Sequence, residues 1–141
     1  MALRSLSTAR YQVRKGYGLM KTGKEVLERA LKLLGYTNSR GELDAVRDAA
    51  LFKRGTVAVI QIYEDLKRID RSGNRLGCIK GMNDNIELSP ETIDDIMPYG
   101  VAMLLAQNEG DGDSQALFAA LYTRKRATVP PKNICRIDIL P

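Results

Sequence analysis

The sequence predicts a mainly α-helical fold: a small helical bundle with an inserted long loop or short β-hairpin, and extended N- and C-terminal arms. Two patterns indicate this fold. Apolar residues recur at helical spacing in several segments, and capping and stop signals bound those segments. The length agrees, because 141 residues with 44% hydrophobic and 28% charged side chains suit one soluble domain around one core.

The first expected helix follows Thr22. Residues 22–25 read Thr-Gly-Lys-Glu, which fits a capping box in which the threonine and glutamate side chains bond exposed backbone N–H groups. Gly35 is placed to end the helix in a left-handed cap. The apolar residues between these signals fall on one helical face: Val26, Leu27, Ala30, Leu31 and Leu34.

A second helical pattern starts at Glu42 and runs to Ile69. Gly55 and Thr56 interrupt it, so the segment is either one long helix or two helices with a break. The apolar run at 57–63 resembles a strand, but its continuation into polar and apolar residues at helical spacing favours helix.

Residues 72–89 lack a helical period and contain three glycines. Two alternatives are open for this segment: residues 76–79 and 86–88 form two short strands of a hairpin, or the whole segment is an extended loop. A long loop in a small domain often contacts a partner. Ser89-Pro90-Glu91 then marks a helix start, with a capping hydroxyl, proline at the first helical position and an acid in the first turn.

Two further helices are expected after this start. Met97-Pro98 marks a kink or a restart, and the helix that follows is apolar over most of its surface, which predicts a central position. Residues 108–114 form a turn in which Ser114 caps the last helix. That helix continues through Leu117, Phe118, Leu121 and Tyr122 and ends at Val129-Pro-Pro.

These elements divide the chain into a basic N-terminal arm at 1–21, a helical domain at 22–131 and an extended C-terminal tail at 132–141. The tail is rich in isoleucine and alternates in part between apolar and polar residues, so it is suited to lying along another surface. A fold-back as an edge strand on residues 76–88 of the same chain is the alternative.

The positive charge is concentrated in the arm. The whole chain has a net charge of +5, the first 24 residues hold six bases and no acid, and the rest is close to balance. The arm is either a solvated tail or a contact for DNA phosphates or an acidic protein surface. The candidate contact residues are Arg4, Arg10, Arg14 and Lys15. A small nucleic-acid-binding protein that uses this arm is therefore the alternative function.

Two further charge blocks oppose each other in sign. Residues 84–113 hold eight acids and no base, and residues 124–136 are mainly basic. Such blocks suggest complementary faces between identical neighbours in a ring, although a basic cluster at a helix end also complements the helix dipole. The hypothetical subunit-interface residues are Asp94, Asp95, Arg124, Lys125 and Arg126.

No catalytic or cofactor-binding set is recognisable. The chain has no histidine, and Cys78 and Cys135 lie too far apart for a CxxC motif. Nothing in the sequence indicates a secreted scaffold, which favours two reduced thiols, and a disulfide between the two cysteines is the alternative. Asp111-Gly-Asp113 resembles the start of a calcium loop but lacks the later ligands. We therefore expect no enzyme, no cofactor and no metal, and neither a membrane span nor a secretory signal is evident.

The C-terminal half contains a recognisable order of motifs. A proline-tyrosine-glycine-x-alanine stretch opens the central helix, a glycine-aspartate turn follows, and the final helix carries aromatic residues and a basic pair. The residues that form these motifs are Pro98, Tyr99, Gly100, Ala102, Gly110, Asp111, Phe118, Tyr122, Lys125 and Arg126. This order resembles that of the head-to-tail connector proteins of tailed bacteriophages, also called adaptor or head-completion proteins. In pattern, the similarity covers residues 22–127.

The resemblance implies a virion protein that forms a ring, commonly of twelve copies, between the portal and the tail. Such rings extend the DNA channel and provide the tail attachment site. The implied partners are the portal protein, tail or nozzle proteins, further copies of the chain and packaged DNA, with assembly in the host cytoplasm and no membrane contact. The family's C-terminal tail often inserts into the portal, which makes the candidate portal-binding residues Ile134, Arg136, Ile137, Ile139 and Leu140.

Overall fold

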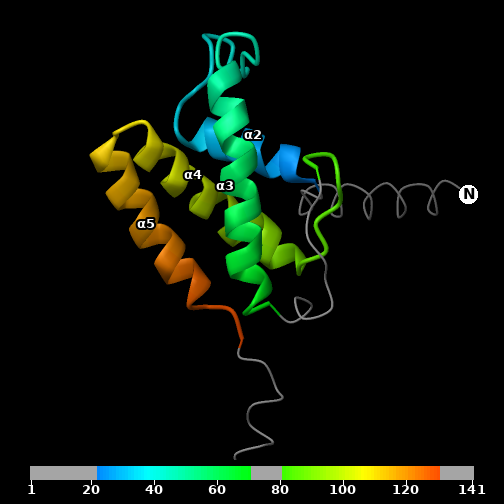
Figure 1. The fold of residues 1–141 in the computed structure, drawn as a ribbon. Coiled ribbons are helices and arrows are strands. Elements are labelled where there is room, and N and C mark those ends of the chain that lie inside the picture. The colour runs from blue at the N-terminus through cyan, green and yellow to red at the C-terminus, as the bar shows by residue number, and fades with distance from the viewer. Residues whose placement is uncertain (1–21, 71–80, 131–141) are drawn as a thin grey trace, which may run out of the picture.

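The structure is a computed structural model, and it describes residues 22–70 and 81–130. These residues form four α-helices and one π-helical turn, η2, which directly precedes α4 (Figure 1). The mainly α-helical fold class is therefore confirmed. The elements are α2 (Gly23–Leu33), α3 (Ala49–Lys67), η2 (Thr92–Ile96), α4 (Met97–Asn108) and α5 (Gly112–Arg126).

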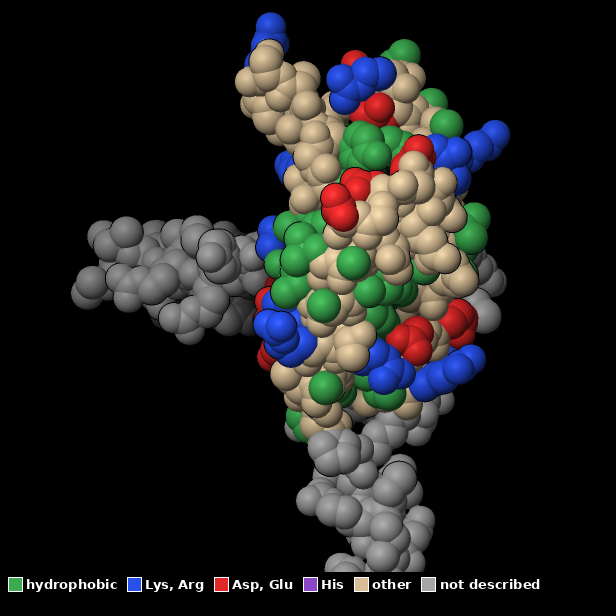
Figure 2. All heavy atoms as spheres, turned by 90° about the vertical axis from the view of Figure 1, so that its left-hand side faces the viewer, with side chains coloured by type: hydrophobic (Ala, Val, Ile, Leu, Met, Phe, Trp, Pro, Cys, Tyr) green, Lys and Arg blue, Asp and Glu red, His purple; other side chains and the backbone are tan. Residues whose placement is uncertain are grey.

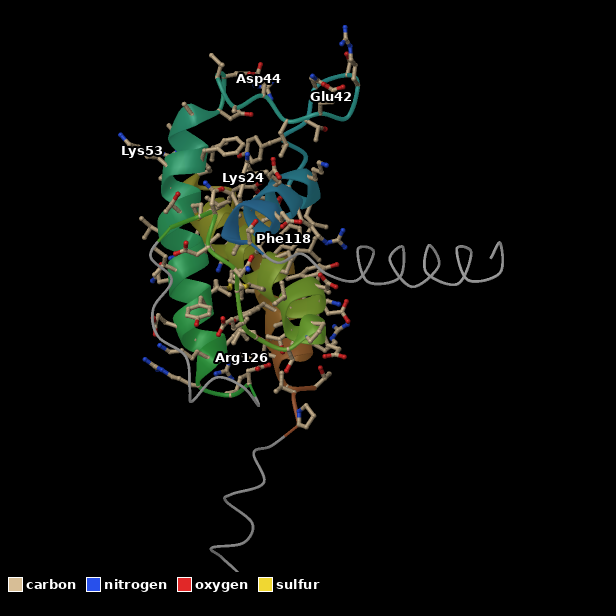
Figure 3. All side chains as sticks on the ribbon, turned by 90° about the vertical axis from the view of Figure 1, so that its right-hand side faces the viewer. Lys24, Glu42, Asp44, Lys53, Phe118 and Arg126 are labelled. Carbon is tan, nitrogen blue, oxygen red and sulfur yellow. The ribbon has the colours of Figure 1, made fainter. Side chains whose placement is uncertain are left out.

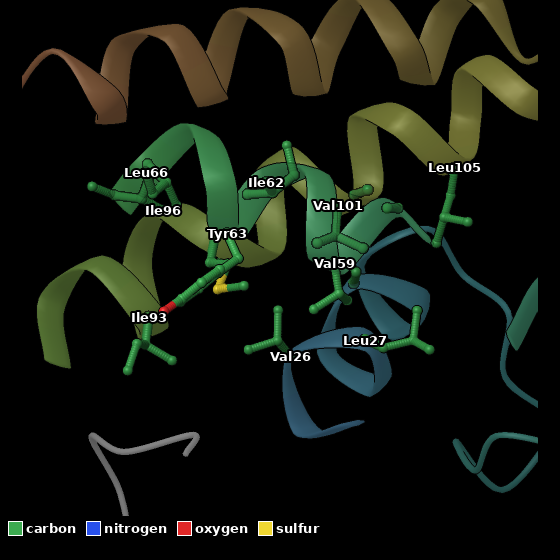
Figure 4. Packing of buried hydrophobic residues seen from close by; sticks show 14 of the residues in the cluster. Val26, Leu27, Val59, Ile62, Tyr63, Leu66, Ile93, Ile96, Val101 and Leu105 are labelled. Carbon is green, nitrogen blue, oxygen red and sulfur yellow. The ribbon is translucent and has the colours of Figure 1, made fainter. Parts of the chain in front are cut away.

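Helix α4 lies at the centre of the bundle, as its apolar composition predicts. It contacts α2, α3 and α5 as well as η2, and Met97, Val101 and Leu105 are completely buried. Figure 4 shows Val101 and Leu105 packed among side chains of α2 and α3. Because one helix touches all the others, its side chains set the spacing of the whole bundle.

Helix α2 follows the sequence prediction closely. Thr22 and Glu25 form both halves of the capping box, with the Glu25 N–H donating to Thr22 Oγ1 at 3.3 Å. Gly35 has a φ of 89°, the left-handed conformation expected of the residue that ends the helix. The apolar face of α2 is buried in the core.

The second helix starts later than its apolar pattern predicts. Residues 42–44 have no regular structure, residues 45–48 form a turn, and α3 begins at Ala49. The side chain of Asn38 accepts hydrogen bonds from the N–H groups of Arg40 and Glu42, and Asp44 accepts from two residues after it. These side chains bond the backbone locally and compete with helix formation. Val46, placed on the expected apolar face, is 89% exposed.

Gly55 does not break α3, which settles the open choice in favour of one helix. The glycine is buried where α2 crosses α3, and a Cβ atom there would overlap with Leu27 Cδ1. A residue that weakens an isolated helix is thus required by the close approach of two helices.

Two predicted caps are wrong in detail. Residue 90 is the first helical one after the loop, but the Ser89 hydroxyl donates to Asp70 Oδ2 at 3.2 Å instead of capping the helix. Asp111 rather than Ser114 caps α5, because its carboxylate accepts from the Ser114 N–H at 3.1 Å. The restart at Met97-Pro98 is confirmed, since η2 ends at Ile96 and α4 begins at Met97.

The loop before η2 is irregular where the structure describes it. Residues 86–88 form no strand, and the isolated bridge in this region joins Asn85 to Thr22. The Lys24 N–H also donates to the Met82 carbonyl at 2.9 Å, so this part of the loop lies along the start of α2. The other predicted strand, at 76–79, lies outside the described residues.

Candidate interaction site at the C-terminal end of the bundle

A hollow of about 480 Å³ lies where the ends of α3 and α5 meet the start of η2. Asp70 lines it after α3, Thr92 and Asp95 line it from η2, and Val129 and Pro130 close it after α5. Pro130 is the last residue that the structure describes before the C-terminal tail.

Asp70 is a buried acidic residue at the hollow, next to the buried Thr92. Its side chain is 1% exposed, and it accepts hydrogen bonds from the Ser89 N–H and hydroxyl, both at 3.2 Å, and from Thr92 Oγ1 at 2.7 Å. A buried carboxylate requires such donors. Asp70 therefore fastens the end of α3 to the residues that begin η2.

A second group of polar contacts joins α3 to α5 close to this end. Tyr122 donates its hydroxyl to Asp65 Oδ2 at 2.5 Å, and the Arg126 guanidinium holds both carboxylate oxygens, at 2.9 and 3.2 Å. Two parallel N–H bonds to one carboxylate fix both distance and angle. We call this group, consisting of Asp65, Tyr122 and Arg126, the α3–α5 clamp.

The clamp shifts the pKa of its members. Burial acts to raise the pKa of Asp65, but the hydrogen bonds from Arg126 and Tyr122 and the Arg126 charge outweigh it, and the net pKa lies below its usual value. Burial and the adjacent Asp65 raise the pKa of the Tyr122 hydroxyl. The clamp therefore holds a charged carboxylate and a neutral phenol.

Lys125, next to Arg126 in the sequence, has a different partner, an aromatic pair formed by Tyr99 and Phe118. Its Nζ lies 4.6 Å from the ring centroid of Tyr99, and the ring centroids of Tyr99 and Phe118 are 6.2 Å apart. A cation over an aromatic face is attracted by the ring quadrupole. Lys125 and Arg126, which were predicted to face a neighbouring subunit, thus both make contacts within their own chain.

Arg124 is the remaining member of the basic cluster. It is exposed, and none of the ion pairs of the described residues includes it. Asp95, an interface candidate of the opposite sign, is exposed at the hollow, and Asp94 is half-buried beside it. Arg124 and Asp95 are therefore the predicted interface residues that remain most accessible to a neighbour.

The opposite end of the bundle has a polar group that sequence reasoning missed. Arg54 of α3 pairs with Glu109, which follows α4. Burial, followed by the nearby charges of Glu109 and Asp111, raises the pKa of the Tyr36 hydroxyl. Figure 3 shows Glu42 and Asp44 at this end and Arg126 at the other. The sequence gives no indication that Arg54 and Glu109 pair, because each is a single charged residue and the two are far apart in the chain.

The remaining predicted contact residues lie outside the residues that the structure describes. They comprise the DNA or acidic-partner candidates of the arm, the portal-binding candidates of the tail and both cysteines: Arg4, Arg10, Arg14, Lys15, Cys78, Ile134, Cys135, Arg136, Ile137, Ile139 and Leu140. Among residues 22–70 and 81–130, no three Asp, Glu, Cys or His side chains are grouped to bind a metal ion. No helix of that same part is long and apolar enough to span a bilayer.

Comparison of the chain with protein-family models, with curated proteins and with solved structures finds no match.

Proposed function

We propose that this chain is a structural virion protein of a tailed phage. In this proposal, copies of the chain form a ring, of twelve subunits, between the portal and the tail, extending the DNA channel and providing the tail attachment site. Its partners are then the portal protein, tail or nozzle proteins and further copies of itself. Its location is the neck of the virion, assembled in the host cytoplasm.

The observation that carries the proposal is that the residues of the connector-like pattern pack together. Gly100 lies against Tyr122, Tyr99 lies against Phe118 and under Lys125, and Asp111 caps the helix that carries Phe118. The pattern residues therefore include the side chains that set how closely α4 and α5 approach each other. These residues form the crossing of α4 with α5, the most extensive helix contact of the bundle.

The sequence of the tail, and the location of the residue that precedes it, support the same function. Residues 131–141 continue from Pro130 at the edge of the hollow, and the tail contains four large apolar residues. Removing large apolar side chains from water lowers the free energy. A tail of this kind, starting at one end of a bundle, is suited to bind a groove of the portal, with Arg136 paired to an acid there.

Contacts between neighbouring subunits follow from the charge blocks. Arg124 is accessible on one helix and Asp95 is accessible at η2. Exposed ion pairs are screened by salt, so a ring held partly by such pairs assembles less well as ionic strength rises. An assembled ring in which residues 84–113 and 124–136 lie far from any neighbour would contradict this part of the proposal.

Deletion of residues 133–141 tests the proposed function. The truncated chain and the full chain are each co-expressed with the portal protein of the same phage genome, and co-purification and electron microscopy report binding. We expect the truncated chain to keep its circular dichroism spectrum and melting temperature, to lose portal binding and to yield heads that leak DNA.

A matched control keeps the tail at full length and replaces the polar residues Asn133 and Asp138 with serine. This control should bind the portal as the full chain does. Normal portal binding without the tail, or unfolding upon truncation, would contradict the portal-binding role of residues 133–141.

A further inference from the structure

Helix α5 has apolar residues on both its inner and its outer face. Phe118 and Tyr122 are buried in the core, whereas Leu117 is 56% exposed, and Ala116 and Ala120 beside it are also exposed. Figure 2 looks onto this side of the molecule and shows hydrophobic side chains exposed across the middle of the face. A surface helix normally presents polar residues to water, so the outer face of α5 is suited to contact another surface.

Charged residues flank this apolar strip. Asp113 lies in the first turn of α5 and Arg124 in the last, and both are exposed. Their spacing from Leu117 and Ala120 places all four on one side of the helix. Neither charge takes part in an ion pair of the described residues. Along α5, the outer face therefore carries an acidic residue first, then the apolar strip and finally a basic residue.

This order is self-complementary. Asp113 and Arg124 are equally far from the midpoint between Phe118 and Ala119, and so are Leu117 and Ala120. If a second copy of the helix lies antiparallel across that midpoint, each acid faces a base and each leucine faces an alanine. Opposite charges and large-to-small packing then agree in one register.

We infer that the outer face of α5 binds the same face of a second copy of this chain, antiparallel and about a two-fold axis. A two-fold contact uses the same patch on both subunits, which is what this symmetric order of residues provides. Two copies complete this contact, so it yields a dimer and no larger assembly. The dimer forms from the free chain, without other proteins. The two-fold contact does not require a ring, but a ring that uses Arg124 would have to break this contact when it assembles.

The size of the face sets the expected strength. One face of a 15-residue helix buries less than the roughly 1,200 Å² of a standard interface, which is the range of weak and transient contacts. We therefore expect a dissociation constant on the order of 10–100 µM. Dimers should appear only when the chain is concentrated.

Sedimentation equilibrium of the full chain, from about 1 to about 500 µM, measures this association. Leu117→Glu should raise the dissociation constant at least about tenfold, because it places two charges against apolar surface. Val57→Glu is the matched control, since Val57 on α3 is 62% exposed and lies on another helix. It should leave the association unchanged. A wild-type chain that stays monomeric throughout, or equal effects of both variants, would overturn the inference.

Charge reversal tests the antiparallel register. Asp113→Lys and Arg124→Glu should each weaken self-association, because each places like charges opposite one another. Mixed together, the two variants should form a heterodimer in which both charge pairs are again attractive, and the Asp113→Lys/Arg124→Glu double variant should self-associate. Circular dichroism confirms that every variant is folded. Absence of restored association in both experiments would overturn the register.

Discussion

Gly100 of α4 lies directly against the ring of Tyr122 of α5: a Cβ atom at position 100 would be 2.7 Å from Tyr122 Cε1. The same atom would lie 2.8 Å from Ile62 Cδ1 of α3. Three helices therefore meet at one hydrogen-sized side chain. The Tyr122 ring cannot easily move away, because its hydroxyl is bonded to Asp65.

Gly100→Ala should destabilise the bundle by about 1–3 kcal/mol through overpacking. At this chain length, that loss lowers the melting temperature by roughly 3–10 °C. Gly112→Ala is the matched control, because nothing lies within 4 Å of a Cβ atom there and the backbone is helical. That control should be neutral or raise stability by up to about 1 kcal/mol. Equal melting temperatures for the two variants would show that the close approach is absent.

Tyr122→Phe tests the hydroxyl of the α3–α5 clamp. It removes one hydrogen bond to Asp65 while leaving the ring in the core, so it should cost about 1 kcal/mol of unfolding free energy. Tyr99→Phe is the matched control, since the Tyr99 ring is packed but its hydroxyl has no hydrogen bond with the residues described. Chemical denaturation of both variants measures the difference. A larger loss for Tyr99→Phe would contradict this role of the clamp.

The clamp also predicts how stability responds to acid. The pKa of Asp65 is lowered in the folded chain, so its contribution is complete above the usual aspartate pKa of about 4 and is lost as pH falls through the lower, folded pKa. The Asp65 and Arg126 side chains are 35% and 37% exposed, and solvent screening limits this contribution to about 1 kcal/mol or less.

Asp65→Asn gives the measurement. Urea unfolding of the variant and the wild type should differ most at pH 6–7, and the difference should shrink as pH falls below about 4. A gap that stays constant down to pH 2 would show that the Asp65 charge is not its source.

The sequence predicts the helices better than it predicts their boundaries. The Thr22–Glu25 capping box and Gly35 bound α2 correctly because both signals are local. The predicted start of the second helix is wrong because the side chains of Asn38 and Asp44 form hydrogen bonds with nearby backbone N–H groups. The low helix propensity of glycine makes Gly55 a candidate for a break in the helix. In the structure Gly55 instead leaves room for Leu27, and the helix continues through it.

The candidate site is less predictable than the fold, for a physical reason. The basic cluster at residues 124–126 is visible in the sequence, but its three members have three different surroundings. Arg126 faces Asp65 on α3, Lys125 faces Tyr99 on α4, and Arg124 faces outward. Adjacent residues on a helix point in different directions, and their partners lie on other helices. Pairing of this kind depends on how the helices cross.

Asp70→Ala should be among the most destabilising polar substitutions in the described part of the chain. It leaves the Thr92 hydroxyl and the Ser89 N–H without their buried acceptor, which we expect to cost about 2–3 kcal/mol. Hydrogen exchange at residues 89–96 should accelerate most. Asp95→Ala is the control: it lines the same hollow but is exposed, and its effect should stay within about 0.5 kcal/mol. Similar losses in both variants would contradict an anchoring role for Asp70.

The basic arm separates the proposed function from its alternative. The sequence predicts that residues 1–21 form an arm outside the helical domain. Replacing Arg4, Arg10, Arg14 and Lys15 with glutamine should then leave the melting temperature nearly unchanged. Two measurements then distinguish the functions. In a neck subunit, the substitutions weaken assembly or DNA retention in heads, and the free chain binds DNA weakly with or without them.

In a nucleic-acid-binding protein, by contrast, the free wild-type chain binds short duplexes, and its affinity falls steeply with salt. Removing four phosphate contacts should then reduce the slope of log affinity against log salt by about 3.6. Fluorescence anisotropy of both chains at several salt concentrations measures that slope. Tight, salt-dependent binding by the free wild-type chain that the four substitutions abolish would favour the alternative. A large loss of melting temperature would instead place the arm within the folded core.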